Sequence, residues 1–183
     1  MQRRELLRLL GGAVTLSALA GLPPERLLAL GRATHARAGA ATARGIAAHA
    51  RETIAAVAEL ILPESDTPGA GAVGVPAFIE QILDEWQTDE ERKNLLTGLD
   101  DLDRQSGAGG AASFLALTPD AKQQLLTRLD AAKGEPASAE ACFATLKALT
   151  VYGYFTSEPI VTGVLKSPII PGRYDGCAPF ATR

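Results

Sequence analysis

Apolar residues recur every three or four positions along most of this chain, and no stretch alternates apolar with polar residues over a strand's length. A spacing of three and four places side chains on one face of an α-helix, whereas a half-buried strand alternates with a period of two. The five faces are Ile54, Val57, Ala58 and Ile61; Phe78, Ile79, Ile82, Leu83 and Trp86; Leu95, Leu99 and Leu102; Leu125, Leu126 and Leu129; and Cys142, Phe143, Leu146, Leu149, Thr150 and Gly153. The pattern predicts an all-α fold, a small bundle of five to six helices with an irregular C-terminal tail from Ser167 onward.

Residues that favour helix starts precede four of these faces. Pro76 suits a first helical position, where its missing N–H would have no partner in any case. Thr88 and Glu91 have the spacing of a capping box, in which each side chain bonds the backbone N–H of the other residue. Thr118 and Ser138 are N-cap residues. Helices are therefore expected to begin at or next to these positions.

The N-terminal segment differs from the rest in charge and in pattern. An arginine pair, Arg3 and Arg4, precedes the apolar run Leu9–Ala20, which is too short for a comfortable membrane span. This order of features resembles the twin-arginine export signal, whose route carries proteins that are already folded. We predict residues 1–38 to be a twin-arginine signal peptide, residues 39–47 a flexible linker and residues 48–183 a helical domain.

The cleavage site of this leader has two candidates. Ala36-Arg37-Ala38 fits the small-x-small rule and would leave Gly39 as the new N-terminus, and Ala18-Leu19-Ala20 fits it as well. A leader that is not cut would tether the protein to the membrane or remain as a loose helix. The alternative to export is an amphipathic N-terminal helix of a cytosolic protein.

The charge and the reactive residues exclude several functions for the body of the chain. Residues 1–38 hold six arginines and two glutamates, so the remainder carries twelve basic and nineteen acidic residues. Such an acidic body does not suit nucleic acid, whose phosphates require clustered Lys and Arg. Two cysteines and His49, the one histidine outside the predicted leader, supply no metal framework. Asp100, Asp101 and Asp103 are interpreted as a solvated helix face, so no catalytic, cofactor or metal residue is predicted.

Aromatic residues gather near the C-terminal end, where all three tyrosines lie. Tyr152, Tyr154 and Phe155 cannot share one face of a helix, because they span roughly 300° around its axis. Ser157 is expected to cap a further short helix that runs through Leu165. The residues alone leave two alternatives open, a tail that wraps the bundle and a surface that binds a partner.

Two segments of this region resemble the C-terminal signature of the gluconate 2-dehydrogenase subunit 3 family. They are Tyr154-Phe155-Thr156-Ser157-Glu158-Pro159 and Gly172-Arg173-Tyr174-Asp175-Gly176-Cys177-Ala178-Pro179. Earlier stretches are similar to other landmarks of the family: Ile61-Leu62-Pro63, Thr67-Pro68-Gly69-Ala70 and Gly74-Val75-Pro76-Ala77-Phe78-Ile79. The resemblance runs from about Ile54 to Pro179.

The resemblance implies a non-catalytic small subunit that holds no cofactor itself. The implied partner is a large FAD flavoprotein of the glucose–methanol–choline (GMC) oxidoreductase type, with a c-type cytochrome and its haem c as a possible acceptor. Such complexes oxidise sugars, glycosides, sugar acids or polyols in the periplasm. The flavoprotein is implied to be exported folded, through the twin-arginine translocase, on the small subunit's signal at Arg3 and Arg4, and to be stabilised in a chaperone-like way.

The same resemblance assigns the tail to the partner interface. The residues expected to contact the flavoprotein or to shape the contact surface are Tyr152, Tyr154, Phe155, Arg173 and Tyr174. Cys142 and Cys177 can form a disulfide in the oxidising periplasm, or remain buried thiols or partner contacts. A stand-alone periplasmic helical protein, either an enzyme or a ligand binder, is the alternative function, and a membrane-tethered scaffold is a third.

Overall fold

The computed structural model describes residues 23–38, 46–108 and 110–166. Within these ranges the chain is helical, with no strand, which confirms the predicted all-α bundle. The helices are α3 (Pro24–Ala38), α4 (Ala48–Ile61), α5 (Val75–Glu85), α6 (Asp89–Gly107), η1 (Phe114–Ala116), α7 (Pro119–Ala131), α8 (Ala139–Thr156) and η2 (Pro159–Val164). Helices α4 to α8 and the short η2 are those that the sequence pattern predicts, whereas α3 lies within the segment assigned to the leader.

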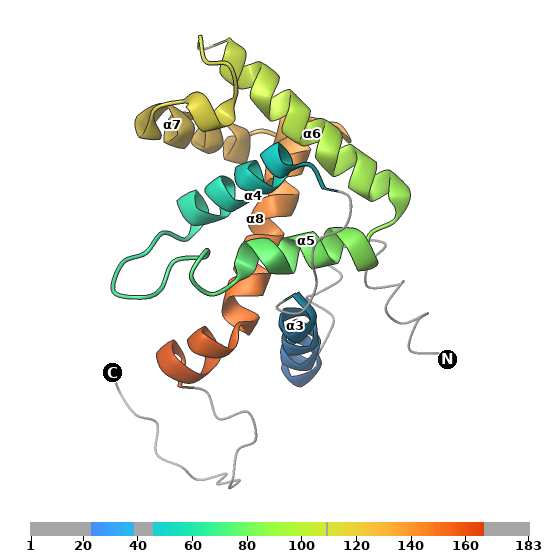
Figure 1. Cartoon of the computed structure of the whole chain (residues 1–183), viewed down its shortest axis with the longest axis vertical. Coiled ribbons are helices and arrows are strands. Elements are labelled where there is room, and N and C mark those ends of the chain that lie inside the picture. Colours follow the sequence, from blue (N-terminus) through green and yellow to red (C-terminus); the bar gives the residue numbers. More distant parts are fainter. Residues whose placement is uncertain (1–22, 39–45, 109, 167–183) are drawn as a thin grey trace, which may run out of the picture.

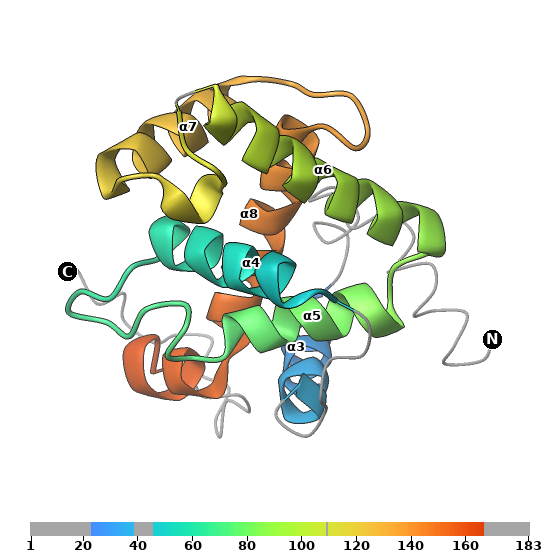
Figure 2. The same ribbon diagram turned by 45° about the horizontal axis from the view of Figure 1, so that its top comes forward.

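Helix α8 forms the axis of the bundle, and each of the other described α-helices packs against it. Figures 1 and 2 show α8 (orange) running the length of the molecule, with α4 and α5 crossing its middle, α6 and α7 at one end and α3 at the other. Its buried residues lie on one broad face of the helix: Ala139, Cys142, Phe143, Leu146, Leu149, Thr150, Gly153, Tyr154 and Thr156. Exposed residues, among them Lys147, Val151 and Phe155, follow the opposite face at helical spacing.

The helix starts lie where the capping residues predict them. Thr88 and Glu91 form the capping box: the Glu91 N–H donates to Thr88 Oγ1 over 3.2 Å, and the Thr88 N–H donates to Glu91 Oε2 over 2.9 Å. Thr118 and Ser138 each accept from the backbone N–H three residues on, at the starts of α7 and α8. Helix α5 begins at Val75, so Pro76 occupies its first turn.

The interpretation of Ser157 as an N-cap is wrong. The first turn of η2 has no side-chain cap, and the Ser157 hydroxyl instead donates backwards to the Tyr154 carbonyl over 2.7 Å. Ser157 therefore closes the last turn of α8, where carbonyls lack helical partners. The segment after it is a π-helix, in which the Leu165 N–H donates to the Ile160 carbonyl over 2.8 Å.

The loop between α4 and α5 is fixed from both sides. The Glu59 carboxylate, on α4, accepts from the N–H groups of Glu64 and Gly71 over 3.3 and 2.9 Å. From α8, the Tyr154 hydroxyl donates to the Pro68 carbonyl over 2.8 Å. These bonds hold the loop, and with it the start of α5, against the C-terminal end of α8.

Among the described residues no helix has the length and apolar character needed to cross a membrane.

Candidate functional site

The three aromatic residues at the end of α8 point in different directions, as their spacing predicts. Tyr154 is buried, with its hydroxyl on Pro68. Tyr152 is half-buried, and its ring meets Phe78 edge-on with centroids 5.7 Å apart; burial raises the pKa of its phenol to about 12. Phe155 is 45% exposed and meets the Tyr154 ring edge-on at 5.5 Å. Phe155 is thus available to a partner, while Tyr154 fixes the surface around it.

Exposed large apolar side chains are concentrated beside these aromatics. In the part of the chain that the structure describes, the four most exposed are Val151 and Phe155 on α8, at 39% and 45%, and Val164 and Leu165 in η2 and just after it, at 41% and 46%. Val151 and Phe155 are four residues apart and share one face of α8. We call these four residues the C-terminal apolar set.

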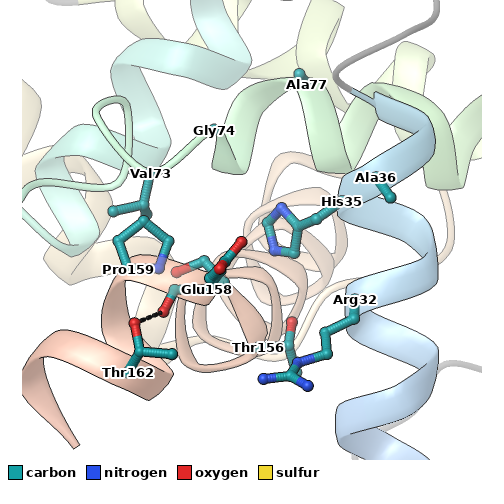
Figure 3. A pocket seen from close by; sticks show the side chains of 11 residues that line it. Arg32, His35, Ala36, Val73, Gly74, Ala77, Thr156, Glu158, Pro159 and Thr162 are labelled. Atoms are coloured by element: carbon teal, nitrogen blue, oxygen red, sulfur yellow. Dashed lines mark hydrogen bonds between the residues drawn. The ribbon is translucent and has the colours of Figure 1, made fainter. Parts of the chain in front are cut away.

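A pocket of about 600 Å³ opens on the other side of this region, between α3, the start of α5 and the α8–η2 junction. Its lining residues are Arg32, His35, Ala36, Val73, Gly74, Ala77, Thr156, Ser157, Glu158, Pro159 and Thr162. Figure 3 shows Arg32 and His35 reaching in from α3, opposite Glu158, Pro159 and Thr162. The pocket therefore has one cationic and one anionic side chain among mainly small residues.

The imidazole of His35 has a structural place in this pocket. Its Nε2 lies 2.6 Å from the Gly153 carbonyl oxygen, and its ring stacks on Phe78 with centroids 4.7 Å apart. Burial lowers the pKa of His35, although the bond to Gly153 opposes this. Because a carbonyl only accepts, Nε2 carries the proton and donates it. The nearby Ser157 hydroxyl donates to Tyr154 rather than to His35, so the two do not form a nucleophile–base pair.

Two of the three aspartates interpreted as a solvated face make tertiary hydrogen bonds instead. Asp101 Oδ2 accepts from the Ala139 N–H at the start of α8 over 2.9 Å. Asp103 accepts from the Phe114 N–H over 2.8 Å and meets His49 Nε2 at 2.6 Å. Only Asp100 is exposed, as the pattern predicts. His49 therefore links α4 to α6 at the surface, and both aspartates hold helices together.

Five of the predicted site residues lie outside the described residues: Arg3, Arg4, Arg173, Tyr174 and Cys177. Cys142 is a buried thiol on α8, packed against Gly98 of α6, and burial raises its pKa to about 12. A disulfide with Cys177 would have to enter this helix interface, and the pairing stays a prediction. In the described ranges no three His, Cys, Asp or Glu side chains are close enough to hold a metal ion.

The comparison with family models decides the family. The model described as gluconate 2-dehydrogenase subunit 3 matches residues 48–172, which is more than half of the chain. This chain belongs to the gluconate 2-dehydrogenase subunit 3 family. The identification made from the sequence motifs is confirmed, and the chain is by family an accessory subunit of a dehydrogenase complex. No curated protein and no solved structure matches it.

The family match covers residues 48–172 and leaves both α3 and the end of the tail motif outside. The matched range runs from the start of α4 through η2 and includes the C-terminal apolar set. Its end at Gly172 leaves Arg173–Pro179 of the tail motif outside the match. Helix α3 precedes the matched range, so the family match gives no role to the side chains that α3 contributes to the pocket.

Proposed function

We propose that this chain is the non-catalytic small subunit of a periplasmic or membrane-associated, FAD-dependent GMC-type sugar or glycoside dehydrogenase. It binds the large flavoprotein, stabilises it and supplies the twin-arginine signal on which the folded complex is exported. The FAD and the active site belong to the partner, and a c-type cytochrome with haem c is the electron acceptor. The observation that carries the proposal is the family match, which runs from α4 through η2 and includes the C-terminal apolar set.

The docking surface in this proposal is the C-terminal apolar set. Burial of apolar surface at a partner contact contributes a favourable free energy of roughly 25 cal/mol per Å². Aromatic side chains contribute most to such contacts. Phe155 and Val151 share a face of α8 whose opposite side is fixed in the core by Leu149 and Gly153. The exposed side chains therefore stand on a rigid element, which lowers the entropic cost of binding.

The docking surface is tested by co-expression with a candidate GMC-type flavoprotein from the same genome. The wild-type chain is expected to co-purify with a yellow, flavin-containing partner. Phe155→Glu is expected to weaken the complex by about 2 kcal/mol, roughly 30-fold in Kd, because a charge would be buried at the contact. Gln124→Glu on α7 adds the same charge at the far end of the molecule and serves as the control. Equal retention of flavoprotein by both variants would contradict this surface.

The pocket supports a second candidate, a stand-alone periplasmic binder of a small anionic ligand. Its volume of about 600 Å³ lies in the range of small-molecule sites, and Arg32 offers a cation there. Titration of the isolated chain with gluconate, followed by calorimetry, tests this candidate. Gluconate binding that the Arg32→Ala variant loses would favour the ligand-binding candidate. If millimolar gluconate gives no heat of binding, the subunit function is the one candidate that remains.

A further inference from the structure

Helix α3 is packed into the bundle although it lies in the segment with leader-like composition. It contacts both α5 and α8, and Figure 1 shows it (blue) against the lower part of α8. Among the α3 residues whose burial is described, Gly31 and Thr34 are buried, the latter with only 1% of its surface exposed. These residues are three apart and lie on one face of the helix. The opposite positions Ala29, Ala33 and Ala36 are exposed, so α3 has a defined inner face.

At Gly31 the helices α3 and α8 approach each other closely. A Cβ atom at this position would overlap the side chain of Thr156 in the last turn of α8. Only glycine permits this separation, and glycine lowers the stability of a helix interior by about 1 kcal/mol relative to alanine. The close contact compensates for that loss, as expected for a helix that belongs to a folded domain.

Four residues further along the same face, His35 adds a directional contact. Its Nε2–H donates to the Gly153 carbonyl over 2.6 Å, and the Thr156 hydroxyl makes a longer contact of 3.4 Å to the same oxygen. Its ring covers Phe78, which is 0% exposed. Loss of α3 would therefore uncover a phenylalanine ring and a backbone carbonyl together.

We infer that α3 is a permanent part of the folded domain and is retained in the mature protein. The sequence Ala36-Arg37-Ala38 is then not a cleavage site, because Ala36–Ala38 form the last turn of α3 and proteolysis favours exposed loops over helices. Any processing falls before Pro23, where the matching small-x-small sequence is Ala18-Leu19-Ala20. The processing part of this inference rests on the proposed export. Retention also preserves the pocket, since Arg32, His35 and Ala36 line it.

The first test does not depend on export. The full chain is expressed in the cytoplasm and purified, and its amide hydrogen exchange is measured. The α3 amides are expected to be protected together with those of α5. Gly31→Leu is expected to raise exchange in α3 about tenfold or more while α4 and α6 keep their protection. Ala33→Leu places the same side chain on the exposed face and is the control. Unprotected α3 amides in the wild type, or equal exchange in both variants, would overturn the inference.

The second test determines the N-terminus of the exported chain, co-expressed with its flavoprotein, by intact mass and N-terminal sequencing. An N-terminus at or before Pro23 is expected. An N-terminus at Gly39 would overturn the inference even if export succeeds. If the chain is not found in the periplasm at all, the proposed function fails, and the exchange experiment alone decides whether α3 belongs to the domain.

Discussion

At the scale of single residues, side-chain volume at helix crossings decides how closely the bundle packs. Gly153 on α8 faces Phe78 of α5, and a Cβ atom there would lie 2.8 Å from the Phe78 Cδ1 atom. Phe78 is fully buried, and its ring contacts His35 and Tyr152 as well as Gly153. Gly153 therefore permits close packing between α5 and α8 at the expense of helix stability.

Gly153→Ala is expected to destabilise the protein although alanine is the better helix former. Overpacking lowers the free energy of unfolding by about 1–3 kcal/mol, and the better helix propensity of alanine raises it by about 1 kcal/mol. A net decrease of about 1 kcal/mol is therefore expected in urea unfolding. Gly107→Ala, with open space around its Cβ position, is the matched control and should be neutral or stabilising. A Gly153→Ala protein more stable than wild type would contradict this packing.

The buried His35 makes stability depend on pH. Its pKa in the folded protein lies below its ordinary value of 6.5, mainly because of burial, so the unfolded chain binds its proton first as pH falls. The stability that neutral His35 contributes is therefore complete above about pH 6.5 and declines as pH falls towards the lowered pKa. Urea midpoints at about pH 7.5 and 5.5 should differ more for wild type than for His35→Gln. An equal difference in the two proteins would count against the docked imidazole.

At the scale of helices, long-range hydrogen bonds set the positions of the elements. Asp101 on α6 accepts from the first N–H of α8, 38 residues away along the chain, and pairs with Arg104 on its own helix. Its carboxylate thus satisfies a helix N-terminus from outside that helix, where a negative charge also suits the helix dipole.

Asp101→Ala is expected to lower the free energy of unfolding by about 1–2 kcal/mol, because the Ala139 N–H loses its acceptor. The neighbouring Asp100 is exposed and provides a control: Asp100→Ala should change stability by no more than about 0.5 kcal/mol. Thermal or urea unfolding of the two variants makes the comparison. Equal effects would mean that Asp101 is only a surface charge.

The helix caps could be predicted from the sequence, whereas the hydrogen bonds between elements could not. Caps at Thr88, Thr118 and Ser138 are predictable because donor and acceptor are three residues apart. The hydrogen bonds that Asp101, Asp103 and Glu59 accept are not predictable from the sequence. Each carboxylate meets a backbone N–H of another element or loop, and only the packing of the bundle brings the two together. The cap expected at Ser157 is not formed for a related reason: two helices meet there, and the Ser157 hydroxyl donates to a carbonyl of the earlier one.

The candidate site was predictable in part. The spacing of Tyr152, Tyr154 and Phe155 already required that they face different ways, but not which one would be exposed. The pocket had no sequence signal, since its lining comes from α3, the start of α5 and η2. Leader-like composition hid α3 itself: Pro24 and Glu25 are a good helix start, which was the signal that could have revealed it.

At the scale of the whole molecule, the two ends of the bundle have different characters. Helices α6 and α7 at one end expose charged residues such as Arg104, Arg128 and Asp130. The C-terminal apolar set lies at the other end, where α8 passes into η2 (Figure 1). An accessory subunit with this asymmetry would bind its flavoprotein by the apolar end and leave the charged end in water.

The central claim is that this chain carries a folded flavoprotein out of the cytoplasm. Its most direct test replaces Arg3 and Arg4 by lysine in cells that also express the flavoprotein, followed by fractionation with immunoblots for both chains and flavin absorbance. Arg26→Lys, outside the arginine pair, is the control. The account predicts both proteins in the periplasm for wild type and control, and both in the cytoplasm for the double-lysine variant. Flavoprotein at wild-type levels in the periplasm with that variant, or without this chain, would contradict it.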